Sequence, residues 1–307
     1  MISDRANRAA IVLAGGEGTR LAGITRRPDG VHVPKQFCAL AGETSLLEDT
    51  RRRVSLSVLS ERVFFALTKD HQRFFSPLLA DVSEHNLIVQ PLNRGTAPAI
   101  LYSLLRLVES ASRASVLLIP SDHHVEDEAA LMKYVDLAFA EVEAHPQLIV
   151  LIGIAPDVPE TSYGWIEPAP AATAADQHRA LPVRRFWEKP SYEIASELMR
   201  TGCLWNSFMT VGQVQTLLGL FALAMPELYV SFSKLRPTLG TLFEEEVIGR
   251  FYQSLRSADF SRQVLEPAAH SLSVLPVSNV GWSDLGQPHR LAHAIARCGT
   301  RQKEAAA

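Results

Sequence analysis

The sequence has few of the features that mark secreted, zinc-binding or membrane proteins. Its 307 residues include three cysteines, Cys38, Cys203 and Cys298, and no CxxC pair. This scarcity argues against a disulfide framework or a zinc knuckle and favours a reducing cytoplasm. The apolar runs are too short for a signal peptide or a membrane span. The net charge of -3 gives no basic footprint for nucleic acid. We therefore expect a soluble, cytoplasmic protein without nucleic-acid or membrane partners.

What the sequence does contain indicates one α/β domain over residues 1–307. Its composition is 47% hydrophobic and 21% charged, as in ordinary globular proteins, and no repeat or clear linker divides it. Runs rich in Val and Ile, typical of strands buried on both faces, lie at Ala9–Leu13, Arg62–Leu67, Asn86–Val89, Ser115–Ile119 and Leu148–Ile152. Helical spacing lies between them at Ser45–Ser55, Ala97–Ser110 and Ala130–Ala144.

This alternation predicts right-handed crossovers and a Rossmann-like, mostly parallel mixed sheet flanked by helices. After residue 155 the stretches SYGWIEP and VRRFWEKP predict shorter, antiparallel strands, and Pro168–Ala180 between them is expected to be an exposed, mobile loop. The remaining expectations are a frayed C-terminal tail, RQKEAAA, a late strand at Ser271–Val277, and helices at Tyr192–Arg200, Val214–Met225 and Thr241–Leu255.

The stretch AAIVLAGGEGTRL joins the first predicted strand to three glycines and an arginine. Ligands of open parallel sheets sit at the carboxyl ends of the strands. Glycines there let backbone N–H groups approach a phosphate, and Arg20 adds a cation with fork geometry. The loop matches neither GxGxxG, because Leu21 replaces the third glycine, nor the P-loop, because no lysine follows. Taken alone, a tight strand-to-helix turn explains it equally well.

Further motifs follow the glycine loop in order along nearly the whole chain. They are PKQF (34–37), NRGTAPAI (93–100), PSDHHV (120–125), PETSYGWIEP (159–168), FWEKP (186–190), WNSFM (205–209) and VGWSDLG (280–286). Together they resemble the signature of the nucleoside-diphosphate-sugar pyrophosphorylases, or sugar-1-phosphate nucleotidylyltransferases. PKQF, NRGTAPAI, WNS and GWSD resemble the mannose-1-phosphate guanylyltransferase branch.

The resemblance implies the nucleotide-diphospho-sugar transferase fold and a nucleotidyl transfer. Residues 1–155 would form the nucleotide-binding half, residues 156–212 a small antiparallel sugar-phosphate-binding part, and residues 213–307 a helical segment that completes the metal site. GTP and mannose-1-phosphate would give GDP-mannose and pyrophosphate. Such a reaction needs positioning and charge neutralisation rather than a protein nucleophile.

Roles for individual residues follow from the same resemblance. The nucleotide-binding residues would be Leu13, Gly15, Gly16, Gly18, Thr19, Arg94, Gly95, Thr96 and Ser121. The catalytic residues would be Arg20, Lys35, Asp122 and Lys189. The sugar-phosphate-binding residues would be Tyr163, Gly164, Glu188, Lys189 and Asn206. Asp122 and Asp284 would bind one Mg²⁺, whose preference for few, hard oxygen ligands from the protein fits two carboxylates.

Simpler interpretations stand beside several of these roles. Lys35 alone is an ordinary surface lysine, and Glu188 and Lys189 alone are a solvated strand end before a proline. Asp284 alone is a plausible helix N-cap. The adjacent His123 and His124 lack the spacing of a zinc site, so we interpret them as structural or as supporting the metal ligands.

Three departures from the motifs concern the sugar more than the chemistry. WNSGMF of the related branch is WNSFMT here, with Phe208 in place of a glycine, and RNTAPAI has Gly95 in place of an asparagine. The related branch also carries the segment SIDYAVMEK, and the aligned segment here is DFSRQVLEP (259–267). Ser261, Arg262 and Pro267 therefore stand where that segment has Asp, Tyr and Lys. The short segment after GWSD-G also leads us to expect neither an appended isomerase domain nor a long β-helix.

Three functional interpretations therefore stay open. The first is a mannose-1-phosphate guanylyltransferase-like enzyme. The second keeps the chemistry with another nucleoside triphosphate or another hexose- or heptose-1-phosphate. The third is an inactive relative that binds nucleotide sugars and regulates a partner, which the intact set of cations and carboxylates disfavours. A homodimer is an open alternative to a monomer.

Overall fold

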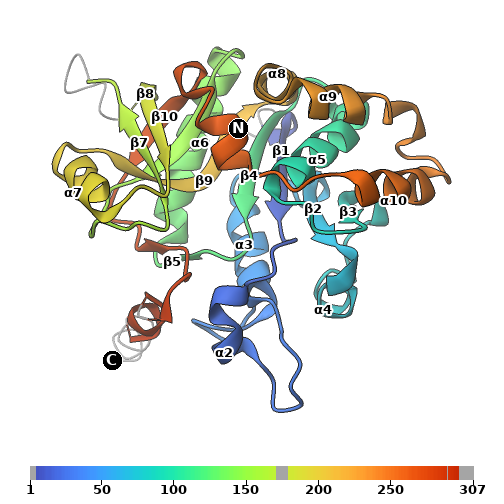
Figure 1. The fold of residues 1–307 in the computed structure, drawn as a ribbon, viewed down its shortest axis with the longest axis horizontal. Coiled ribbons are helices and arrows are strands. Elements are labelled where there is room, and N and C mark those ends of the chain that lie inside the picture. The colour runs from blue at the N-terminus through green and yellow to red at the C-terminus, as the bar shows by residue number, and fades with distance from the viewer. Residues whose placement is uncertain (1–4, 171–178, 289, 297–307) are drawn as a thin grey trace.

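A computed structural model describes residues 5–170, 179–288 and 290–296, and Figure 1 shows its arrangement of helices around one central sheet. The nine strands of this sheet follow the order β3-β2-β1-β4-β9-β6-β10-β8-β7. Their bounds in this order are Leu87–Gln90, Val63–Thr68, Arg8–Leu13, Ser115–Pro120, Leu204–Gln213, Ile149–Ile154, Ser273–Val277, Leu181–Glu188 and Gly164–Pro168. Two short strands, β5 (His124–Val125) and β11 (Trp282–Ser283), form a separate antiparallel pair.

The strand pairing confirms the predicted mixed α/β sheet. β1 is parallel to β2 and β4, β2 is parallel to β3, and β10 is parallel to β6. β7 and β8 pair in antiparallel fashion, as the aromatic and polar sequence after residue 155 predicts. The five strands expected in the first half and the late strand all form, with ends shifted by one or two residues.

Strand β9 is the main element that the sequence patterns did not predict. It runs antiparallel between β4 and β6, and its first residues also pair with β7. Its sequence, LWNSFMTVGQ, mixes polar and apolar residues, yet most of its side chains are buried, because those on the two faces of the strand enter the two cores on either side of the sheet. β9 therefore links β4 of the first half of the chain to β6 and β7.

Helices cover both faces of the sheet. Alternate residues of β1 enter different cores: Ala9 and Ile11 pack with α5 and α8, whereas Ala10 and Val12 pack with α3 and α6. Such alternation is the period of two expected for a strand between two helical layers. The helices are α2 (Ala22–Thr25), α3 (Leu46–Val54), α4 (Gln72–Leu78), α5 (Thr96–Ala111), α6 (Glu128–Ala144), α7 (Tyr192–Arg200), α8 (Val214–Ala224), α9 (Pro226–Ser233) and α10 (Glu244–Ser254).

Most of the helices agree with the sequence patterns. The bounds predicted for α7 are those observed, and α3 begins with a capping box in which Ser45 and Glu48 satisfy each other's backbone N–H groups. α4 and α9 were not predicted: α4 contains Pro77, and α9 starts directly after α8, with Pro226 at its first turn. A proline there replaces an N–H that would have had no partner in the helix, so it starts α9 rather than breaking it.

Parts of some predictions lie outside the described residues. These are residues 171–178 of the predicted loop, Cys298 and the tail RQKEAAA. Cys38 and Cys203, which are described, have free thiols. Within the described ranges, no helix combines the length and the apolar character that a membrane crossing requires.

Candidate active site

The glycine loop lies at the carboxyl end of β1, where the polypeptide makes close contacts. Gly18 has a φ of 61°, and a Cβ there would lie 2.8 Å from the backbone nitrogen of Lys35. A larger residue would therefore separate the loop from the short 3-10 helix Lys35–Phe37. Gln36 of that helix donates from Nε2 to the carbonyls of Ala14 (3.0 Å) and Gly16 (2.8 Å). The motifs GGEGTRL and PKQF thus form one unit.

A cavity of about 650 Å³ opens beside this unit. Eight residues of the predicted set line it: Leu13, Gly15, Gly16, Arg20, Gly95, Thr96, Ser121 and Asp122. Sequence reasoning missed a further group of polar lining residues, namely Gln36, Gln90, Asn93, Asp259 and Gln263. Gln36 belongs to the motif PKQF and Asn93 to the motif NRGTAPAI. Membership in these motifs could have identified both residues as candidates for the site.

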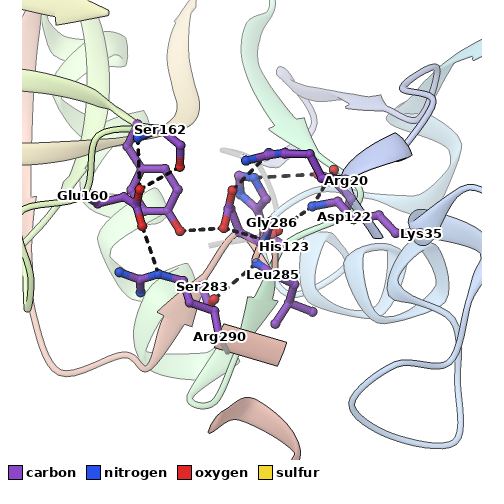
Figure 2. A network of polar contacts seen from close by, with 12 residues as sticks. Arg20, Lys35, Asp122, His123, Glu160, Ser162, Ser283, Leu285, Gly286 and Arg290 are labelled. Carbon is purple, nitrogen blue, oxygen red and sulfur yellow. Dashed lines mark hydrogen bonds and ion pairs between the residues drawn. The ribbon is translucent and has the colours of Figure 1, made fainter. Parts of the chain in front are cut away.

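Two cations and two carboxylates from distant parts of the chain meet beside the cavity, which Arg20 and Asp122 line, and Figure 2 shows Arg20, Lys35 and Asp122 among them. The Lys35 side chain is only 6% exposed, and its Nζ lies 3.1 Å from Asp122 Oδ2 and donates to the main-chain oxygen of Asp284 at 2.5 Å. Arg20 is half-exposed and places Nη2 3.4 Å from Asp284 Oδ2. The ordinary surface position considered for Lys35 is therefore wrong, because its ammonium is buried between two carboxylate-bearing segments.

Asp284 is held by a second set of contacts. The Tyr163 hydroxyl donates to Asp284 Oδ1 at 2.5 Å, and the Gly286 N–H donates to the same oxygen at 2.7 Å. Burial and the negative charge of Asp284 raise the pKa of Tyr163, so the phenol remains protonated and acts as the donor. Arg290 Cζ lies 5.4 Å from the centroid of the Tyr163 ring, and Arg290 Nε lies 3.6 Å from Glu160 Oε2. The hydroxyl of Tyr163 thus contacts the predicted metal ligand, and the role of Tyr163 in binding the sugar stays a prediction.

The charge state of the neighbouring Asp122 is fixed by the same cluster. Burial alone would raise its pKa, but the charge of Lys35 and the hydrogen bonds that Asp122 accepts act against burial, and the pKa is lowered. His123 itself has its pKa lowered to about 4, chiefly by burial. It is therefore neutral near pH 7 and accepts a 3.3 Å hydrogen bond at Nδ1 from the indole of Trp282. Asp122 thus presents a charged carboxylate beside a neutral imidazole.

The predicted sugar-binding residues cluster where β7, β8 and β9 meet. Gly164 pairs with Glu188 across β7 and β8. A Cβ on Gly164 would lie 3.0 Å from Glu188 Oε2 and 3.2 Å from the Cβ of Asn206, so the three residues touch. Lys189 Nζ lies 2.5 Å from Glu188 Oε1 and acts to lower the pKa of Glu188. Burial outweighs this effect, and the pKa of Glu188 is raised. The approach of β9 to β7, rather than any local pattern, brings Asn206 here.

Comparison with known proteins places this geometry in a family. The nucleotidyl transferase family model matches residues 9–300, which is nearly the whole chain. The chain belongs to the nucleotidyl transferase family. Enzymes of this family act on nucleoside triphosphates and sugar-1-phosphates and generally use a divalent metal ion. The match confirms the resemblance on which the residue roles rest.

Several named members of the nucleotidyl transferase family are similar to the chain. Mannose-1-phosphate guanylyltransferase RfbM of Salmonella typhimurium is 30% identical over 286 residues, which cover 90% of this chain and 56% of the relative. Alginate biosynthesis protein AlgA of Pseudomonas syringae pv. tomato is 30% identical over 280 residues, with the same two coverages. The chain thus spans a little over half the length of the curated relatives that it matches.

Solved structures agree with the fold of this nucleotidyl transferase. A structure described as mannose-1-phosphate geranyltransferase from Thermus thermophilus has a TM-score of 0.77 and 28% identity, and covers 91% of this chain and 76% of that one. A putative glucose-1-phosphate thymidylyltransferase from Bacillus anthracis has a TM-score of 0.56 at 15% identity, covers 95% of each chain and supports the fold alone. The predicted nucleotide-diphospho-sugar transferase fold is confirmed.

Not every predicted nucleotide contact is among the residues that line the cavity. The described residues that line it do not include Gly18, Thr19 or Arg94. The Arg94 guanidinium turns toward α10, where Nε donates to the Tyr252 carbonyl at 3.0 Å and Nη2 to the Gln253 carbonyl at 3.4 Å. Arg94 therefore anchors the loop before α5, while Gly95 and Thr96 next to it reach the cavity.

Proposed function

We propose that this protein transfers a nucleotidyl group from a nucleoside triphosphate, GTP by preference, to a sugar-1-phosphate, mannose-1-phosphate by preference. The products are GDP-mannose and pyrophosphate. The observation that carries the proposal is the junction of Arg20, Lys35, Asp122 and Asp284, of which Arg20 and Asp122 line the glycine-loop cavity. The relatives named mannose-1-phosphate guanylyltransferase support the choice of base and sugar.

The reaction brings two anionic phosphates together, so the site has to supply positive charge and hydrogen-bond donors. An oxygen of the sugar-1-phosphate attacks the α-phosphorus, the bond from the α-phosphorus to the α,β-bridging oxygen breaks, and its electron pair leaves with pyrophosphate. The attacking phosphate is already anionic, so no general base is needed. Backbone N–H groups of the glycine loop bind the triphosphate, while Arg20 and Lys35 stabilise the charge that grows on the leaving oxygens. Lys189 would hold the phosphate of the sugar, and Glu188 and Asn206 its hydroxyl groups.

A divalent cation, Mg²⁺ in this proposal, fits the two carboxylates. The described residues contain no group of three or more His, Cys, Asp or Glu side chains that would enclose a metal ion. Two aspartates joined through Lys35 suit an ion that keeps water and binds substrate phosphates. When bound, such an ion neutralises phosphate charge. Tyr163 and Gly286 fix one oxygen of Asp284, which leaves the Arg20-facing oxygen to exchange partners.

A panel of nucleoside triphosphates crossed with sugar-1-phosphates, read by pyrophosphate release, tests the proposal. We expect the highest kcat/KM for GTP with mannose-1-phosphate. Activity with another pair would keep the chemistry and replace the base or the sugar. No pyrophosphate with any pair, despite measurable nucleotide-sugar binding, would reject the enzyme and leave a regulatory protein.

We further propose a cytoplasmic location, which the free thiols Cys38 and Cys203 support. A homodimer stays a prediction.

The substitution Tyr163→Phe distinguishes between two roles for this residue, which are to orient the metal ligand Asp284 and to bind the sugar. Removal of the hydroxyl that orients Asp284 should raise the Mg²⁺ concentration for half-maximal activity by about 10-fold, as for other groups that orient metal ligands. Direct Mn²⁺ binding, measured by water-proton relaxation, should weaken by a similar factor. Tyr192→Phe is the control, since that side chain is 63% exposed. Unchanged metal affinity with a raised KM for the sugar-1-phosphate would instead assign Tyr163 to the sugar.

A further inference from the structure

Phe208 stands in a backbone conformation that favours glycine. Its φ is 66°, in the left-handed region that bulky side chains rarely adopt. It lies in a bulge of β9: Thr210 pairs with Leu151 and Asn206 with Gly153, so three β9 residues face one residue of β6. Strain of this kind gathers at binding and catalytic sites, where the surrounding structure maintains it.

The bulge is held by its own polar side chains and not by the phenyl ring. The Phe208 N–H donates to Asn206 Oδ1 at 3.0 Å, and the Thr210 hydroxyl donates to the Phe208 carbonyl at 3.2 Å. The Ser207 hydroxyl donates to the Ile152 carbonyl at 2.6 Å across the strand pair. Because none of these bonds involves the ring, the bulge should persist when the residue at position 208 is changed.

Phe208 contacts both the cavity and the predicted sugar-binding residues. It lines the cavity that also contains Gly15 and Arg20. The centroid of its ring lies 5.8 Å from that of Phe260, which is fully buried and packs against it. On the other side, the backbone bond to Asn206 joins Phe208 to the Gly164–Glu188–Asn206 cluster. Phe208 therefore connects the cavity wall to this cluster, and its ring is placed to limit the size of a sugar bound between them.

We propose that Phe208 is a specificity-determining residue for the sugar. Its ring narrows the sugar end of the cavity and restricts the protein to unsubstituted hexose-1-phosphates, against heptose-1-phosphates and N-acetylhexosamine-1-phosphates. The inference rests on the proposed function and adds a substrate class to it. The related motif WNSGMF has glycine at this position, so the same bulge without a ring would leave this volume open. A rigid aromatic wall discriminates because it overlaps with the larger sugar, and it needs no additional attraction to the smaller one.

Phe208→Gly and Phe208→Ala test the proposal in the full chain. Both remove the ring, but only glycine also relieves the left-handed backbone, so an effect common to both is due to lost volume. We expect the ratio of kcat/KM for mannose-1-phosphate over N-acetylglucosamine-1-phosphate to fall at least about 10-fold in both variants, with the KM for GTP unchanged. Phe243→Ala is the matched control, because that ring is 67% exposed and does not line the cavity.

Binding measurements keep this test independent of catalysis. Calorimetry should show that both variants bind GDP as the unchanged protein does, and that they gain affinity for the GDP conjugate of the larger sugar. Unaltered discrimination between the two sugars in both variants would overturn the proposal. An equal loss of affinity for GDP and for GDP-sugars would also overturn it, since Phe208 would then support the nucleotide. Inactivity of the unchanged protein toward every substrate pair would reject the proposed function alone, and the binding ratios would still decide the role of Phe208.

Discussion

Lys35→Met should lower kcat by about 10²- to 10³-fold, the effect typical of removing one preorganised charge from a transition state. The ammonium lies beside Asp122 and on the Asp284 carbonyl, and methionine preserves most of the aliphatic stem that packs there. Charge that develops on pyrophosphate would lose a desolvated cation, which acts more strongly than one in water. The KM for the nucleotide should change much less, because the lost interaction strengthens as the α,β bond breaks.

Lys69→Met is the matched control for this experiment. Lys69 forms an ion pair with Glu245 in which both side chains are more than half exposed, so its loss should leave kcat unchanged. Pre-steady-state pyrophosphate release would separate the chemical step from product release. Thermal unfolding must confirm that the Lys35 variant is folded. A folded Lys35→Met protein with unchanged kcat would remove Lys35 from the proposed mechanism. Arg20→Ala should act in the same direction but less strongly, because Arg20 is half-exposed and more screened by solvent.

Removal of divalent metal should abolish turnover, with a loss of at least about 10³-fold that Mg²⁺ reverses. The proposal places the ion on Asp122 and Asp284, the carboxylates that contact Lys35 and Arg20. Asp284→Asn should reproduce the loss even at saturating Mg²⁺, since an amide is a weaker ligand and the neutral side chain no longer pairs with Arg20. The activity of chelator-treated protein, with and without added Mg²⁺, checks the first result.

Direct binding of Mn²⁺ checks the metal ligands without reference to activity. Asp122→Asn and Asp284→Asn should each weaken binding, whereas Asp81→Asn should not, because Asp81 lies on the surface in an ion pair with Arg51. Full turnover in metal-free buffer would contradict the assignment of both carboxylates. Lost turnover with unchanged Mn²⁺ binding would place the metal elsewhere in the cavity.

The sequence predicted those parts of the fold whose signal is local. Burial on both faces makes β1, β4 and β6 continuous apolar runs, and helix periodicity with its capping residues marks α3 and α7. β9 escaped this reasoning because the bulge at Phe208 breaks its alternation, and because polar residues such as Asn206, Ser207 and Thr210 are buried in it among apolar ones. α9 escaped because it follows α8 without a loop.

For the candidate site, the sequence by itself determined which chemical groups are present and their order along the chain. The glycine loop, the two cations and the two carboxylates could be named from motifs, because such motifs record residue identity at fixed short spacings. The tertiary structure alone decided what each group touches. It directed Tyr163 to Asp284, turned Arg94 toward α10 and placed Phe208 at the cavity wall. These contacts depend on how distant strands approach one another, and a side chain's partner across a sheet leaves no periodic trace in the sequence around it.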